Sequence, residues 1–422
     1  MLLTDRWKAL LRSHARPMRL TTMLAAGVLT SAAAWGAFPD SQSPPPGWTG
    51  LRFKLSQDYP TALPNSAADT AKPWLAFDFK QPTQAPQYMQ AVLDYCMEGN
   101  VDLTSPQKSF ADISKNTVRV WYHAPWLHPG REFMHGMTNE RKSQAKQLGP
   151  AQTSPQTNWA VGFYNPLGGY TLGQVWKNET APDPAKAQFP QGTVSCKLLF
   201  TNAPLTQVPY LKGSLLWHAD ILRQKDLKAR PTVRLLQLDI AVKDDRAPVT
   251  GWVFGTFQYE KAASTSSQWW KHMVPVGLMW GNDLANIKAN QPPTEQWINT
   301  DRGQKLHLGF RGLLNGPIDN PQASCAACHG FAQVPKPGTA SPAPPLPKTN
   351  TWSKAMTDAK IDIYFQSVGA ASPVSSSYQS LDYSLQLQSG FAKFASAHPG
   401  SAAPASHAAA LQPVPPVPEV KR

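Results

Sequence analysis

Three side chains suited to redox or metal chemistry stand within five residues of one another. Cys325, Cys328 and His329 form the pattern Cys-x-x-Cys-His. On a helical turn, positions i, i+3 and i+4 share one face, so both sulfurs and the imidazole would point the same way. Two such thiols can form a disulfide, bind a metal as thiolates, or add to the two vinyl groups of one porphyrin edge, beneath whose iron the imidazole would lie.

The spacing of this motif is specific. With 4 cysteines and 10 histidines in 422 residues, a chance match is expected about once in a thousand chains of this composition. A thioredoxin-like dithiol would follow a strand, whereas the lead-in here, residues 314–321, is typical of a loop. A zinc site would need two further ligands at short spacing, and no second cysteine pair is near. A simple disulfide stays open, but we predict one covalent haem c on Cys325 and Cys328, with His329 as an iron ligand.

The stretch around this motif resembles the c-type cytochromes. The likeness covers about residues 295–398, and residues 118–136, 159–176 and 313–321 are similar to large single-haem bacterial proteins described as cytochrome c domain-containing. The resemblance implies haem c, His329 as proximal ligand and electron transfer. In small soluble cytochromes, a Met some tens of residues after the motif supplies the sixth iron ligand. Here Met356 is the only Met that follows the motif.

The sixth iron ligand is left open by the sequence. Met356 is one candidate, although it lies in a stretch typical of a helix, where a Met more often packs in a core. His307 precedes the motif by 22 residues and could fold back over the iron, and His398 ends the last expected helix. An open or water-bound site is a further alternative, and a Met ligand would raise the potential.

A second group of possible metal ligands lies upstream. His123, His128 and His135 occur near Glu132 and Glu140. The histidine spacings match no standard ligand pattern on a helix or hairpin, and the stretch is rich in Trp, Phe and Pro. We therefore expect structural roles. The alternative is a wall of a substrate or haem pocket supplied by the β region.

The remaining cysteines, Cys96 and Cys196, lie on separate expected elements. A disulfide between them would suit an oxidising compartment and close a loop of about 100 residues, stabilising the fold by about 4–5 kcal/mol. Two buried free thiols are the alternative, because sequence does not place the two Cβ atoms.

The first 37 residues are typical of an export signal. A basic start ends at Arg19, an uncharged stretch follows, and small residues gather before Phe38. We predict a cleaved signal peptide over residues 1–37 and a periplasmic protein. An uncleaved membrane anchor is the alternative, and no later segment is apolar enough to span a bilayer.

The chain is basic, with a formal net charge of +13. Removing the leader leaves 35 basic and 26 acidic residues, a net charge of about +9. This charge favours an acidic redox partner protein, and it also permits contact with an anionic membrane surface. No dense basic run is interleaved with aromatics, so we do not expect nucleic-acid binding.

Hydrophobic periodicity predicts one helix and then many strands. The helix covers residues 84–98 and stops at Gly99. Residues 159–164 and 170–176 are expected to form a hairpin around a turn at 165–169, and residues 233–242 and 252–259 a second hairpin. Further strands are expected at residues 117–122 and 193–200.

The region beyond residue 290 is expected to be helical, with helices over residues 353–368 and 380–397. The predicted fold class is α+β, a mostly antiparallel β domain followed by a small helical cytochrome c-like domain. The predicted parts are a signal peptide (1–37), a linker (38–49), a β-rich domain (50–290), a haem c domain (291–398) and a disordered Ala- and Pro-rich tail (399–422).

These features predict an exported single-haem electron carrier. Two rivals stay open: a peroxidase-like oxidoreductase in which the β domain forms a pocket over an open iron, and a sensory or binding module.

Overall fold

The computed structural model describes residues 38, 42–50, 52–53, 55–100, 116–127, 130–222, 231–302, 307–336 and 358–398. Chain contacts divide the protein into two compact units, residues 1–36 and 37–422, and the described residues belong to the second. The predicted leader and tail, Met356 and His128 lie outside them. No helix in the described ranges is long and apolar enough to cross a membrane.

An antiparallel sheet of eight strands forms the centre of the described fold. The strands run in the order β1-β2-β3-β5-β6-β7-β8, and β4 also pairs with β5. Their bounds are β1 Thr138–Asn139, β2 Asn158–Tyr164, β3 Val194–Thr201, β4 Leu216–His218, β5 Thr232–Lys243, β6 Trp252–Tyr259, β7 Met273–Met279 and β8 Gln296–Ile298.

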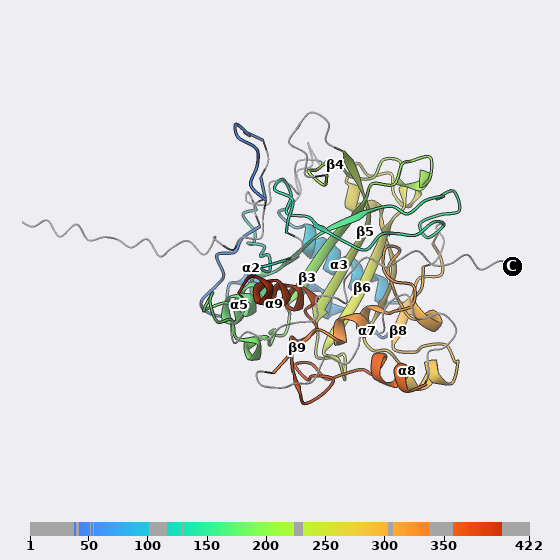
Figure 1. Cartoon of the computed structure of the whole chain (residues 1–422). Coiled ribbons are helices and arrows are strands. Elements are labelled where there is room, and N and C mark those ends of the chain that lie inside the picture. The colour runs from blue at the N-terminus through green and yellow to red at the C-terminus, as the bar shows by residue number, and fades with distance from the viewer. Residues whose placement is uncertain are drawn as a thin grey trace, which may run out of the picture. The chain divides into compact units, whose positions relative to one another are not determined.

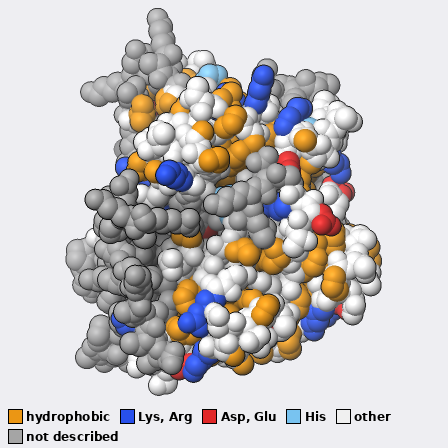
Figure 2. Space-filling model, turned by 90° about the vertical axis from the view of Figure 1, so that its right-hand side faces the viewer, with side chains coloured by type: hydrophobic (Ala, Val, Ile, Leu, Met, Phe, Trp, Pro, Cys, Tyr) orange, Lys and Arg blue, Asp and Glu red, His pale blue; other side chains and the backbone are white. Residues whose placement is uncertain are grey.

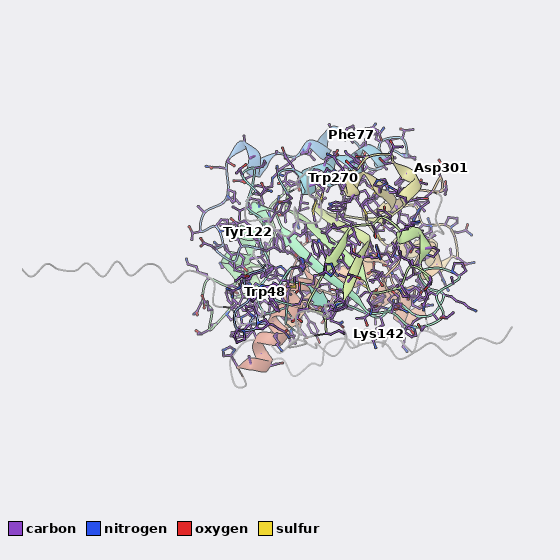
Figure 3. The ribbon with its side chains drawn as sticks, turned by 90° about the horizontal axis from the view of Figure 1, so that it is seen from above. Trp48, Phe77, Tyr122, Lys142, Trp270 and Asp301 are labelled. Atoms are coloured by element: carbon purple, nitrogen blue, oxygen red, sulfur yellow. A yellow bond between two sulfur atoms is a disulfide. The ribbon has the colours of Figure 1, made fainter. Side chains whose placement is uncertain are left out.

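Helix α3 (Ala85–Met97) covers one face of this sheet. Its Cys96 is joined by a disulfide to Cys196 of β3, and a Cβ added at Gly255 of β6 would lie 3.1 Å from Cε of Met89. The views in Figures 1 and 3 place α3 on one side of the strands and helix α9 (Leu385–Ala397) on the other. Phe77 and Trp270 lie on the α3 side (Figure 3).

The opposite face carries the Cys-x-x-Cys-His segment, which forms helix α7 (Cys325–Gly330). The ring of Phe254 from β6 lies 4.8 Å from the ring of His329, centroid to centroid. A Cβ added at Gly162 of β2 would meet the side chain of Gln386 on α9. Helices α7 and α9 of the C-terminal region therefore pack on this face of the central strands (Figure 1).

Shorter elements connect and flank the sheet. The other helices are α2 Ala67–Thr70, α5 Pro166–Val175, α6 Leu284–Lys288 and α8 Asp358–Tyr364. The 3-10 turns are Pro73–Ala76, Pro184–Lys186, Pro209–Leu211, Lys261–Ala263, Trp269–His272 and Phe310–Gly312. A small antiparallel sheet pairs β9 (Gln333–Pro335) with β10 (Tyr378–Ser380).

Several predictions from periodicity are confirmed. The first expected helix is α3, and Gly99 after it has a φ of +71°, a conformation that glycine adopts without steric cost. The hairpin of residues 233–242 and 252–259 is the antiparallel pair β5 and β6. An antiparallel sheet flanked by helices makes the fold α+β.

The predicted hairpin after Tyr164 is wrong, because residues 170–176 belong to helix α5 and not to a strand. The Asn165 side chain accepts a hydrogen bond from the Gly168 amide, and Pro166 occupies the first helical position. Asn at the cap followed by Pro is a helix-start pattern. The strand prediction came from the apolar residues of 170–176, whereas the helix start at Asn165 and Pro166 determines the structure.

Residues 117–122 are also not a strand. Only Tyr122 forms bridges, to Tyr164 and to Ser56. The side chain of Asn116 accepts hydrogen bonds from the amides of Val118 and Arg119. These amides therefore do not bond to a neighbouring strand.

The C-terminal region is less helical than predicted. Of the expected helix over 353–368, the described helical part is α8, and of the expected helix over 380–397 it is α9. Ser380 belongs to strand β10 instead. Residues 296–298 form β8 of the main sheet, and residues 37–422 are one compact unit. The predicted domain bounds stay a prediction. Part of the expected linker packs on the body, since Trp48 contacts Phe133 edge to face.

Candidate functional site

The motif sits on a single capped turn of helix. The Ser324 hydroxyl accepts from the Ala327 amide at 3.0 Å and donates to Oδ1 of Asn282 at 2.6 Å. Ala326 and Ala327, the two intervening residues, are buried against the body. Cys325, Cys328 and His329 are only half-buried. The two alanines are thus the buried residues of this turn, and the three reactive residues are its half-buried ones.

His329 is held at one nitrogen and open at the other. Its Nδ1 lies 2.8 Å from the backbone oxygen of Tyr383, and a carbonyl oxygen only accepts, so Nδ1 carries the proton. Nε2 is then the lone-pair nitrogen. Burial lowers the pKa of His329 to about 4, which keeps the ring neutral. A neutral imidazole oriented through its other nitrogen by a carbonyl is the usual state of a metal-binding histidine.

The carbonyl that orients His329 belongs to an anchored turn. Asp382 and Tyr383 have φ values of 46° and 66°, a left-handed conformation that costs about 1–3 kcal/mol per residue. The fully buried Asp382 carboxylate accepts from Lys243 Nζ at 2.7 Å and from Trp252 Nε1 at 2.8 Å. The Tyr383 hydroxyl donates to the Val368 carbonyl at 2.6 Å. The bonds from Lys243 and Trp252 tie the turn to the sheet, and the bond to Val368 ties it to the segment after α8.

The two cysteines lie in protein surroundings that disfavour thiolates. Burial raises the pKa of Cys328 to about 11, and burial with the nearby Asp319 and Asp239 carboxylates raises the pKa of Cys325 further. Cys328 Sγ lies 3.1 Å from the Tyr364 hydroxyl. Reactive or zinc-binding cysteines have lowered pKa values. These electrostatics therefore disfavour the low-pKa thiolate of a thioredoxin-like dithiol.

The geometry fits covalent attachment of a porphyrin. Cys325, Cys328 and His329 are half-buried residues of helix α7, and the ring of Phe254 lies against the imidazole. Cys325, Cys328 and His329 are the residues that would hold the group. Tyr364 stacks with Phe331 at 5.3 Å, so aromatic surface also borders Cys328.

A polar cluster beside the motif was missed by sequence reasoning. Asp239 of β5 and Asp319 of the loop before α7 both receive hydrogen bonds from Nε2 of Gln237, at 2.8 Å and 3.0 Å. A signal was present, because Gln237 and Asp239 interrupt the apolar run Leu235–Ile240 at alternate positions. Alternation places both side chains on one face of a strand.

The upstream histidines have structural contacts. His135 stacks on Trp217 at 4.3 Å, and its Nδ1 lies 3.2 Å from the Glu132 carboxylate. His123 is fully buried, and desolvation lowers its pKa well below the ordinary value. Glu140 pairs with Lys197. In the part of the chain that the structure describes, no group of three His, Cys, Asp or Glu side chains could hold a metal ion.

Of the sixth-ligand candidates, His307 and His398 lie within the described residues and Met356 does not. His398 bonds through Nδ1 to the Phe394 carbonyl and stacks on the Phe394 ring, at the end of α9. His307 is half-buried and precedes Leu308, which bridges to Leu314. The sixth ligand stays a prediction, with His307 and Met356 as its candidates.

A surface pocket lies on the far side of the sheet. Its volume is about 470 Å³, and Asp94, Tyr95, Glu98 and Trp270 are among its lining residues. Asp94 pairs with Lys271, and Glu98 pairs with Arg119. Since both acids already have cations, this pocket offers no unsatisfied charge to a ligand.

Comparison with known proteins found no matching family model, curated protein or solved structure.

Proposed function

We propose that this chain is an exported c-type cytochrome with one haem, bound through Cys325 and Cys328 and ligated by His329, and that it transfers single electrons. The observation that carries the proposal is the His329 imidazole. Its Nδ1 is engaged by the Tyr383 carbonyl, which leaves Nε2 as the lone-pair nitrogen, and both sulfurs belong to half-buried residues of the same short helix. The motif's resemblance to c-type cytochromes adds weight, and periplasmic export follows from the leader-like start of the chain.

The bound group would supply an iron that cycles between two oxidation states. The protein's own contribution is position and environment. The Tyr383 carbonyl sets the orientation and basicity of His329, and Phe254 keeps water from one side of the imidazole. Tyr364 and Phe331 extend the apolar surface next to Cys328. A low-dielectric surrounding of this kind tunes a potential.

The partner expected for such a carrier is an acidic redox protein. On the face drawn in Figure 2, Lys and Arg side chains are scattered and outnumber the acidic ones. A dispersed basic surface attracts an acidic partner over the Debye length, about 8 Å at physiological salt. Electron transfer to that partner should therefore slow as salt is added.

One observation favours a second function, a haem-dependent oxidoreductase. Asp239 and Asp319 stand close enough to the motif for both carboxylates to raise the pKa of Cys325. A peroxidase-like site would use polar groups of this kind for proton transfer. A six-coordinate low-spin absorption spectrum would favour the carrier, and a high-spin spectrum that changes with added small ligands would favour the enzyme.

Covalent attachment is the first experiment. The full chain is expressed with a periplasmic c-type maturation system and run on a denaturing gel stained for haem peroxidase activity. We expect a stained band at the size of this chain and a pyridine spectrum equivalent to one haem per protein. The Cys325→Ser/Cys328→Ser variant is the matched control and should be unstained. An unstained wild-type protein that is exported and folded would overturn the proposal.

A further inference from the structure

A row of polar residues crosses the face of the sheet on which the motif lies. Lys197 of β3 is directly opposite Asp239 of β5, and Asp239 is directly opposite Thr256 of β6. Directly opposed residues of antiparallel strands share a face. Phe254, two positions from Thr256, contacts His329, so the row and the motif lie on the same side of the sheet.

A loop brings a second carboxylate onto this row. Asp319 accepts from the Gly316 amide at 3.0 Å and from Gln237 Nε2 at 3.0 Å. Asp239 accepts from the same Nε2 and from the Thr256 hydroxyl at 2.5 Å. One amide group therefore joins the two carboxylates, and its two N–H bonds are shared between them.

Neither carboxylate has a cation of its own among the described residues. Lys197 forms its ion pair with Glu140 at 3.2 Å, and Arg141 donates to the backbone oxygens of Ile318 and Asp319. The charged groups that face the pair are thus Lys197, Arg141 and Glu140. With both aspartates ionised these groups carry a net charge of −1, and one bound proton makes the cluster neutral.

The pair is also next to the motif. The loop that carries Asp319 contacts the start of α7, where the Cys325 amide donates to the Leu314 carbonyl at 3.2 Å and Cys325 Sγ lies 3.9 Å from Asn315 Oδ1. Both aspartates are half-buried, so water can deliver a proton to them. Charge at the pair and charge at the motif must therefore influence each other.

We propose that Asp239 and Asp319 form a one-proton binding site whose occupancy is coupled to the oxidation state of the iron held at Cys325, Cys328 and His329. This inference rests on the proposed function. An iron held there would lose one positive charge when the redox partner supplied one electron. The pair would then take one proton from water and release it when that electron left again.

The ionisation of Asp239 agrees with this site. Burial, and next the Asp319 carboxylate, raise the pKa of Asp239 to about 7. Two carboxylates that share a donor cannot both ionise freely, so the first proton is held near neutral pH. Reduced iron should raise this apparent pKa, and the midpoint potential should fall as pH rises through it.

The test measures the carboxyl and the potential separately, in the haem-loaded full chain. Infrared difference spectra between about pH 6 and about pH 8 should show a protonated carboxyl band that disappears with rising pH. The midpoint potential should fall over the same range, by up to about 59 mV for each tenfold fall in proton concentration. Asp239→Asn should remove the band and flatten the potential. The control Asp94→Asn, at an exposed pair with Lys271, should keep both.

Each outcome decides the question. A wild-type protein without the titrating band, or an Asp239→Asn variant that keeps it, overturns the proton site. If the carboxyl band titrates but the midpoint potential does not change with pH, the coupling between proton binding and the oxidation state of the iron is overturned. If the purified protein carries no haem, the proposed function fails, while the infrared band still decides whether the pair binds a proton.

Discussion

The imidazole of His329 has the contacts expected of an iron ligand. The ring of His135 stacks on Trp217, and His123 is fully buried beside Phe53, with no hydrogen-bond partner for either ring nitrogen among the described residues. A ligand to iron must present a neutral nitrogen without another partner. Only the motif histidine combines that nitrogen with two adjacent thiols.

We therefore expect His329→Ala to lose most of its covalent haem, because attachment needs the full motif. Any haem that remains should be high-spin or bound by a stray residue, with an altered potential. His123→Ala, His128→Ala and His135→Ala should leave the haem absorption spectrum unchanged. If His329→Ala keeps a native low-spin spectrum and one of the upstream variants loses it, the iron ligand is not His329 and belongs to the β region.

At the scale of elements, the turn between β10 and α9 determines how the motif histidine is oriented. Asp382 ties this turn to β5 through Lys243 and to β6 through Trp252. Lys243 is only 13% exposed and Asp382 is fully buried, so removing one partner leaves an uncompensated charge. The turn also begins α9, because the Ser384 side chain caps it.

Asp382→Asn should lower the free energy of unfolding by about 3–5 kcal/mol, since it leaves Lys243 without its counter-charge. It should also shift the midpoint potential, because a displaced Tyr383 carbonyl changes the basicity of His329. Asp362→Asn is the matched control. Its pair with Lys288 is exposed, and its loss should change stability by less than about 1 kcal/mol. Equal stability of the two variants in urea denaturation would count against the anchoring role.

At the scale of the whole molecule, the disulfide connects the helix on one face of the sheet to a central strand. Cys96 lies in the last turn of helix α3, Cys196 lies in β3, and the two Cα atoms are 6.5 Å apart. The bond closes a sequence separation of 100 residues. A loop of this length loses much conformational entropy when it is closed in the unfolded chain.

Cys96→Ala/Cys196→Ala should therefore lower the free energy of unfolding by about 4–5 kcal/mol in the chain-entropy account. Chemical denaturation of the wild type and the double variant, both without reductant, measures this difference. Intact mass after alkylation without reductant should show no label on either cysteine in the wild type. Two added labels at these positions would refute the pairing.

Local spacing made parts of the structure predictable. The positions of Cys325, Cys328 and His329 on one face follow from 3.6 residues per turn. Helix α3 and the β5–β6 hairpin follow from periodicity and stop signals, which act over a few residues. The helix α5 was within reach too, because Asn165 and Pro166 mark its start.

The remaining features depend on long-range packing, which a single sequence does not encode in any short pattern. The partner of His329 Nδ1 is a carbonyl 54 residues away, and Gln237 meets Asp319 across 82 residues. Both contacts require a particular strand register and loop path, and a register shift of one residue would turn Asp239 to the opposite face. The sequence by itself determined that three reactive groups share one turn of helix. Only the tertiary structure decided which carbonyl orients the histidine and which carboxylates stand beside it.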